Sequence, residues 1–200
     1  MPAFDPAAHY VLENDVVLLR PLQHDDFTHL LYFSLNEPAL WNFSAAGAAG
    51  KDNLESYIKS TLEARTAGKE YPFIVFDKRS GRYAGCTRFY DIQPTNAAMQ
   101  LGYTWYGKEF QRTGLNRNCK LLLLQFAFEE LGMQRVEFRA NNKNERSINA
   151  MKGIGCTVEG ILRSTGDDLV FGGRRDSIVL SILRNEWDER VKKELKEKIK

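Results

Sequence analysis

The fold is decided by the stretch Trp105-Tyr-Gly-Lys-Glu-Phe-Gln-Arg-Thr-Gly-Leu-Asn-Arg-Asn-Cys-Lys120. It is followed directly by Leu-Leu-Leu-Leu-Gln-Phe-Ala-Phe-Glu-Glu-Leu-Gly132. The apolar run 99–106 is rich in β-forming residues and stops at Gly107. From Leu115 onward, apolar residues recur at helical spacing, and Gly132 suits the C-terminal end of a helix. The sequence therefore predicts a strand, a short loop over 111–116 and a long helix over 115–132.

The predicted loop has the chemistry of an anion site. The first amides of a helix lack intrahelical partners, and the helix dipole adds partial positive charge there. Gly114 permits a positive φ and the close approach of a phosphate, while Arg112, Arg117 and Lys120 bring cations to the loop and the first turns. Neither the ATP/GTP phosphate loop nor the three-glycine dinucleotide pattern is present. A plain strand-to-helix turn with solvated arginines stays open as the alternative.

Composition narrows the class of protein. The 200 residues are 43% hydrophobic and 12% aromatic, which predicts one globular domain over 1–200, with a core at about 16–183 and a charged tail at 185–200. A net charge of +2, from 28 basic and 26 acidic residues, argues against a nucleic-acid binder. No apolar run has the length of a membrane span. The odd number of distant cysteines favours reduced thiols, no metal and a cytoplasmic enzyme.

Periodicity and turn residues predict the order of the elements. The expected strands are 16–20, 71–77, 82–92, 98–106, 135–139, 156–163 and 174–183. The expected helices are 25–36, 52–68 and 115–132, and 141–155 is expected to be a loop followed by a helix. Asp52-x-x-Glu55 is typical of a capping box, and the tail 185–200 of a solvated, partly frayed helix. A crossover between parallel strands requires an intervening helix, and 115–132 can serve as that helix between strands 98–106 and 135–140.

The loop resembles a known family. Gln111-x-x-Gly114-x-Asn116, between a strand and a long helix, resembles the acetyl-CoA pyrophosphate loop of the GNAT N-acetyltransferase superfamily. Together with Asn144-Glu-Arg-Ser147, it is most similar to the RimJ/RimL-like branch of ribosomal-protein N-terminal acetyltransferases, over about 16–183. The resemblance implies an α/β (α+β) fold: a mixed, mostly antiparallel central sheet with a splayed parallel strand pair, flanked by helices. Asn116 stands where the family most often has a small residue.

The resemblance also implies which residues act. Acetyl-CoA would be the co-substrate, with no metal, and its binding residues would be Thr104, Trp105, Tyr106, Gln111, Arg112, Thr113, Gly114, Leu115, Asn116, Arg117, Asn144 and Ser147. Asn144 would hold the pantetheine arm by hydrogen bonding, and Ser147 would protonate or hydrogen-bond the leaving thiolate. From the residues alone, Asn144 is equally an excellent helix N-cap. Many relatives use a tyrosine four residues after the serine, where this chain has Met151.

The general base and the acceptor site are less determined. Relatives often carry an acidic residue where this chain has Gln100, so Glu37, Asp91 and Glu137 remain candidates for the base. A relay of backbone groups and water would need no named base, and the base stays unassigned. The first two helices and the 164–173 turn are expected to frame the acceptor. The expected acceptor-binding residues are Glu37, Trp41, Asp167 and Asp168.

These inferences predict an acetyl-CoA-dependent N-acetyltransferase that transfers acetyl directly to a primary amine, with a protein or peptide N-terminus as the favoured acceptor. Two alternatives stay open: a small-molecule amine or antibiotic acetyltransferase, and a CoA-binding regulatory module without catalysis. No nucleic-acid or membrane partner is expected. Homodimers are common in such enzymes, but the residues themselves give no argument for one.

Overall fold

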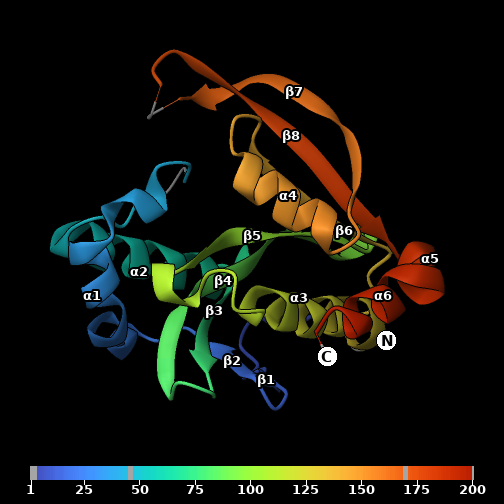
Figure 1. Cartoon of the computed structure of the whole chain (residues 1–200), viewed down its shortest axis with the longest axis horizontal. Coiled ribbons are helices and arrows are strands. Elements are labelled where there is room, and N and C mark those ends of the chain that lie inside the picture. The colour runs from blue at the N-terminus through green and yellow to red at the C-terminus, as the bar shows by residue number, and fades with distance from the viewer. Residues whose placement is uncertain (1–3, 45–46, 169–170, 200) are drawn as a thin grey trace.

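A central sheet organises the described chain, in strand order β1-β2-β3-β4-β5-β6-β8-β7 (Figure 1). The computed structural model describes residues 4–44, 47–168 and 171–199. The strands are β1 Leu12–Glu13, β2 Val17–Pro21, β3 Glu70–Asp77, β4 Arg82–Gln93, β5 Ala98–Tyr106, β6 Arg135–Asn141, β7 Thr157–Asp167 and β8 Arg174–Leu183. The helices are α1 Phe27–Asn36, α2 Lys51–Thr66, α3 Leu115–Gln125, α4 Glu145–Gly153, α5 Arg184–Glu186 and α6 Lys192–Glu197, with single-turn segments between them.

The parallel pair diverges as predicted. β5 and β6 pair in parallel only through Ala98–Gln100 and Arg135–Glu137, although β5 continues to Tyr106 and β6 to Asn141. The ladders between the other neighbouring strands are antiparallel. In the view of Figure 1, α4 lies above this strand pair and α3 below it. The mixed, mostly antiparallel sheet with a splayed parallel pair is therefore confirmed.

A bulge in β5 lies beside the divergence. The β4–β5 register shifts between Cys86 and Arg88, and Tyr103 takes a φ of 49°, a left-handed conformation that is rare for an aromatic residue. An extra residue in one strand leaves a backbone group unpaired and re-aims its neighbours. The bulge therefore disturbs β5 just past the point where β6 stops pairing with it.

The start of α2 differs from the sequence prediction. The helix begins at Lys51 after Gly50, whose φ is 87°, and no side chain caps it, so the Asp52 capping box is wrong. The Ser34 hydroxyl donates to the carbonyls of Ala48 (2.6 Å) and Gly50 (2.8 Å), and the Gly50 amide donates to the Ser34 carbonyl (3.0 Å). Hydrogen bonds with Ser34 of α1 thus fix the start of α2 at Lys51, one residue before the predicted cap at Asp52.

The C-terminal tail also differs from its prediction. The segment from Arg184 to Glu197 is helical, and the side chains of Trp187, Val191 and Leu195 are buried at four-residue spacing. Trp187 stacks on Phe128 with ring centroids 5.5 Å apart, and its Nε1 donates to Glu129 (2.9 Å). α6 lies alongside α3. The tail is therefore a docked part of the core rather than a solvated helix, because three apolar residues on one helical face outweigh the charged composition.

Candidate active site

The loop before α3 has the geometry of an anion site. Gly114 is the N-cap of α3 with a φ of 86°, and an added Cβ there would meet no atom within 4 Å. The Gly114 carbonyl accepts from the amides of Arg117 (3.1 Å) and Asn118 (3.2 Å), so the amides before Arg117 have no partner within the helix. Arg112 takes a φ of 62° and is exposed. Open space, amides without a helical partner and a cation thus meet at one helix N-terminus.

Side chains fix this loop from both directions. Gln111 Nε2 donates to the Tyr106 carbonyl at the end of β5 (2.9 Å), and Gln111 Oε1 accepts from Arg146 Nη1 of α4 (3.0 Å). Arg79, in the turn between β3 and β4, donates from Nη1 to the Thr113 carbonyl (3.1 Å). Sequence reasoning missed Arg79 and Arg146, because no local pattern shows that either reaches the loop.

The three cations assigned to the loop occupy different surroundings. Arg112 and Arg117 are exposed, and Arg117 Nη1 lies 3.4 Å from the Lys198 carbonyl. Lys120 is only 5% exposed, so its placement among the loop cations is wrong. Its Nζ donates to Thr104 Oγ1 (2.8 Å) because the helix turns this position toward the sheet.

Asn144 and Ser147 lie where β6 leads into α4. Asn144 is the N-cap of α4, and its Oδ1 accepts from the Ser147 amide (3.1 Å). This is the capping interaction that the residue types alone allow. Ser147 is half-buried. Whether either residue also meets a substrate stays a prediction.

The three base candidates all accept hydrogen bonds within the protein. Glu37 Oε2 accepts from the Lys108 amide (2.8 Å), and Asp91 Oδ2 accepts from Gln100 Nε2 (2.7 Å). Glu137 forms ion pairs with Arg135 (2.7 Å) and Arg139 (2.6 Å). Each carboxylate thus already has partners within the protein, and these contacts single out none of the three as the base.

Two of the predicted acceptor residues gather at the end of β5. Trp41 packs on Trp105 with ring centroids 5.1 Å apart, and Glu37 joins the neighbouring Lys108. Near the turn between β7 and β8, Phe171 packs against Phe43, with centroids 6.1 Å apart. The region after α1 and the β7–β8 turn therefore approach each other, and their framing of an acceptor stays a prediction.

The two aspartates of this turn have different environments. Asp167 is exposed and pairs with Arg174 (2.8 Å). The Asp168 carboxylate is buried, pairs with Lys143 (3.2 Å) and accepts from the Phe171 amide (3.0 Å). Asp168 thus holds the turn closed, and its role toward an acceptor stays a prediction. Leu169 and Val170 of the 164–173 turn lie outside the described residues.

The cysteines do not favour a covalent intermediate. Cys86, Cys119 and Cys156 are free and buried. Burial raises the pKa of Cys119 and of Cys156 to about 12, so both are protonated thiols at neutral pH. Among the residues that the structure describes, no group of three or more His, Cys, Asp or Glu could hold a metal.

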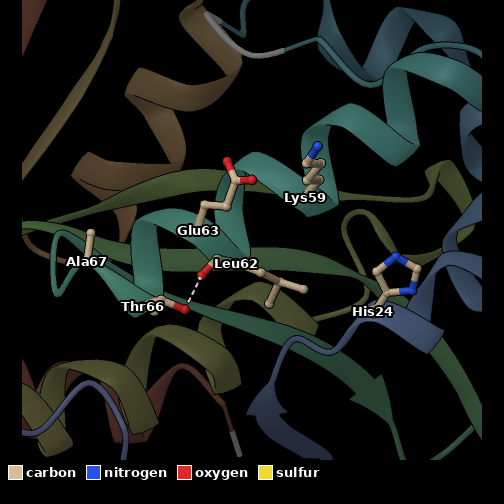
Figure 2. A pocket seen from close by; sticks show the side chains of 6 residues that line it. All are labelled: His24, Lys59, Leu62, Glu63, Thr66 and Ala67. Atoms are coloured by element: carbon tan, nitrogen blue, oxygen red, sulfur yellow. Dashed lines mark hydrogen bonds between the residues drawn. The ribbon is translucent and has the colours of Figure 1, made fainter.

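An open depression of about 460 Å³ lies elsewhere, along α2 (Figure 2). Its lining is His24, Lys59, Leu62, Glu63, Thr66 and Ala67, none of which is a predicted site residue. Within the described part of the chain, no helix is long and apolar enough to cross a membrane.

Known proteins share this arrangement. A family model described as "Acetyltransferase (GNAT) domain" matches residues 17–157. The Bacillus subtilis (strain 168) protein named "Putative ribosomal N-acetyltransferase YdaF" is 27% identical over 179 residues, which cover 86% of this chain and 91% of that protein. A GCN5-related N-acetyltransferase from Brucella melitensis matches with a TM-score of 0.88 at 24% identity, covering 98% of this chain and 88% of that one.

A crystal structure described as a "putative acetyltransferase", from T. thermophilus, matches with a TM-score of 0.84 at 28% identity, and the match covers 100% of both chains. The family model spans well over half of this chain and includes the strand pair, the Gly114 loop and α4. The chain therefore belongs to the GNAT acetyltransferase family and is an N-acetyltransferase.

Proposed function

We propose that the protein transfers the acetyl group of acetyl-CoA directly to the N-terminal amine of a protein or peptide, in the cytoplasm. The observation that carries this proposal is the gap in the β5–β6 ladder: pairing stops beyond Gln100 and Glu137, while β5 continues to Tyr106, before the Gly114 loop. An extended thioester substrate with a pyrophosphate end would fit this arrangement. Its phosphates would bind at the helix N-terminus, and its arm would bind along the unpaired strand edge.

The residues present fit acetyl-CoA. The pyrophosphate would lie against the amides from Thr113 to Asn116, with Arg112 supplying charge, since an added Cβ at Gly114 meets nothing within 4 Å. The free edge of β5 from Thr104 to Tyr106 would hold the thioester end of the molecule. The remaining predicted contacts are with Trp105, Gln111, Leu115 and Arg117. Acetyl-CoA supplies the activated acetyl group, and the protein supplies position and electrostatics.

Direct transfer makes three demands on this chain. Backbone amides of β5 near the bulge would donate to the thioester carbonyl oxygen, where negative charge develops as the amine attacks. The amide group of Asn144 would hold the pantetheine arm while its Oδ1 caps α4, and the Ser147 hydroxyl would donate to the departing sulfur. The base that takes the amine proton is Glu37, Asp91 or Glu137, or a water held by the backbone.

A peptide acceptor suits the residues near Trp105. Trp41 Nε1 is buried and has no hydrogen-bond partner among the described residues, so it is free to donate to an oxygen beside the reacting amine. The first peptide carbonyl of an N-terminus supplies such an oxygen, whereas a simple alkylamine does not. Glu37, Asp167 and Asp168 would supply negative charge around the entering ammonium group. The relative YdaF, by its name a ribosomal N-acetyltransferase, points to ribosomal-protein N-termini as the first acceptors to test.

The test is an acetylation assay with acetyl-CoA, using N-terminal peptides of ribosomal proteins beside small amines and aminoglycosides. Mass spectrometry would locate the added acetyl group, and a thiol reagent would measure CoA release. We expect acetylation at the α-amine of one or a few peptides. Turnover of only the small amines would contradict the acceptor class, and CoA binding without any turnover would favour a regulatory module. Light scattering on the same sample would decide whether the enzyme is a homodimer.

Replacing Ser147 by alanine is expected to lower kcat by roughly 10- to 100-fold, because one hydrogen-bond donor to the leaving thiolate is lost. Binding of acetyl-CoA should change little, since the Ser147 amide, not its hydroxyl, bonds to Asn144. Steady-state kinetics with the best peptide and calorimetric titration with CoA check the two parts. Ser60→Ala, on α2, is the matched control. An unchanged kcat in Ser147→Ala would assign the hydroxyl to packing alone.

A further inference from the structure

Lys120 is a buried amine with no carboxylate partner among the described residues. It is 5% exposed, and its Nζ donates to Thr104 Oγ1 (2.8 Å) and lies 3.4 Å from Thr87 Oγ1. The two threonine hydroxyls are themselves 2.7 Å apart and share a hydrogen bond. Among the ion pairs of the described residues, none includes Lys120. A buried lysine normally has a counter-charge, because desolvating an unpaired ammonium is costly.

The Lys120 amine lies between β5 and β6, beyond the last residues that pair the two strands. Thr104 belongs to β5 and lies beyond Gln100, the last residue of β5 that pairs with β6. On the other side, Lys120 Nζ lies 5.9 Å from the centroid of the Phe138 ring, which belongs to β6 just past its last pairing residue, Glu137. The amine therefore contacts both strands where they have already separated.

Among the described residues, the other groups that face Lys120 carry no charge at neutral pH. β4 and β5 present the hydroxyls of Thr87 and Thr104, and β6 presents the ring of Phe138. The ionisable groups that act on Lys120 are the thiols of Cys119, on its own helix, and Cys156, before β7. Both thiols have a pKa raised to about 12 by burial. Burial lowers the pKa of Lys120 to about 8, so the ammonium is the main form at pH 7.

We propose that the Lys120 ammonium, held in the gap by Thr104, is the counter-charge for the CoA thiolate and donates a proton to it as it leaves. This inference rests on the proposed function, because the thiolate forms only where acetyl-CoA occupies the gap. It also gives a reason for the burial of Lys120, since the missing negative charge arrives with the substrate. Ser147 would approach the same sulfur from α4.

The step balances in atoms and charge. The neutral acceptor amine attacks the thioester carbonyl carbon, a C–N bond forms and the C–S bond breaks, and the electron pair of that bond stays on sulfur. The thiolate takes one proton from the Lys120 ammonium and becomes CoA thiol. The attacking nitrogen loses its proton to the base or to water, and the neutral Lys120 amine regains a proton from solvent.

The first test needs no acceptor. The thiol of CoA bound to the protein is titrated through the ultraviolet absorbance of its thiolate, in the wild type and in Lys120→Met. With the ammonium present, we expect the thiol pKa to lie below that of free CoA. In Lys120→Met we expect it to rise by about 1 to 3 units, the range for losing a partly buried cation a few ångströms away. Equal thiol pKa values in the two proteins would overturn the proposal.

The second test uses acetyl transfer. Lys120→Met should lower kcat/KM by roughly 10- to 100-fold, whereas Lys152→Met, at an exposed position on α4, should retain wild-type kinetics. In the wild type the rate should fall as pH rises through about 8, because the protonated lysine is required, and this fall should be absent in Lys120→Met. If the fall in rate above pH 8 persists in Lys120→Met, another group causes that fall and the proton-donor role of Lys120 is overturned.

Thermal melting separates this role from a structural one. The folded-state pKa of Lys120 lies below its ordinary value of 10.5, so its buried charge costs stability below about pH 8 and that cost is relieved as pH rises toward 10.5. The stability of Lys120→Met relative to wild type should therefore be greatest near pH 7 and decline toward pH 10. A large loss of stability at pH 7 would make Lys120 a structural residue. If no acceptor is turned over by the wild type, the thiol titration still decides the proposal.

Discussion

Replacing Gly114 by aspartate is expected to weaken acetyl-CoA binding by about 100-fold or more, close to 3 kcal/mol. The substitution places a carboxylate at the helix N-terminus where the pyrophosphate should lie, and like charges a few ångströms apart repel by about 1 kcal/mol per unit pair even in water. A left-handed backbone at a φ of 86° adds strain for any residue with a Cβ. Calorimetric titration with acetyl-CoA measures the effect.

Gly114→Asn is the matched control for this charge. Asparagine has nearly the same shape as aspartate and tolerates the left-handed region better than most residues, and the Cβ position is open. We expect Gly114→Asn to weaken acetyl-CoA binding by about 10-fold or less. The difference in affinity between the two variants therefore measures the effect of the negative charge alone. Similar affinities in the two variants, or wild-type affinity in Gly114→Asp, would mean that the phosphates bind elsewhere. Added salt should weaken acetyl-CoA binding more in the wild type than in either variant.

Replacing Gly85 by alanine is expected to destabilise the fold by about 3 kcal/mol or more, a fall in melting temperature of roughly 6–12 °C for a chain of this size. Gly85 lies on β4 with a φ of 154°, and an added Cβ would stand 2.0 Å from the Trp105 carbonyl oxygen and 2.9 Å from the Tyr106 Cα. Both are backbone atoms of β5, so no side-chain rotation relieves the clash. Thermal or urea unfolding measures the loss.

The same substitution should also damage the candidate active site. β4 and β5 must separate near Trp105 and Tyr106, the end of the strand that leads into the Gly114 loop. We expect weaker acetyl-CoA binding in any folded fraction. Gly160→Ala is the control, because Gly160 lies in the exposed strand β7 and an added Cβ meets nothing within 4 Å. A melting temperature within about 1 °C of wild type for Gly85→Ala would show that the sheet relaxes without cost.

Local patterns were sufficient for much of the fold. The strand ending at Tyr106, the helix from Leu115 and the glycine between them follow from periodicity and backbone freedom, which involve residues close together in the chain. The long helix from Leu115 to Glu130 agrees with its prediction apart from a π-turn over Phe126–Glu130. The Asn144 cap is also local, because a cap bonds three residues ahead.

Packing across the chain decided the remainder. The burial of Lys120 depends on two threonines 16 and 33 residues away, and the fixation of Gln111 depends on an arginine 35 residues away. The docking of Trp187 needs Phe128 and Glu129 from the π-turn that follows α3. Each of these contacts joins residues that only the folded sheet and its helices bring together, so no window of sequence contains the information.

The sequence by itself determined the order of the elements and the glycine turn between the strand ending at Tyr106 and the helix from Leu115, because periodicity and backbone freedom involve residues close together in the chain. The parallel pair is implied by the family resemblance, which rests on the 111–116 loop and on Asn144-Glu-Arg-Ser147. Only the tertiary structure decided where the strands part, between Gln100 and the bulge at Tyr103, and which groups line the gap. The physical reason is that burial and electrostatic pairing depend on distances in space. Lys120, which the sequence places among the loop cations, is therefore a buried amine between β5 and β6 once α3 packs on the sheet, and it pairs with no carboxylate among the described residues.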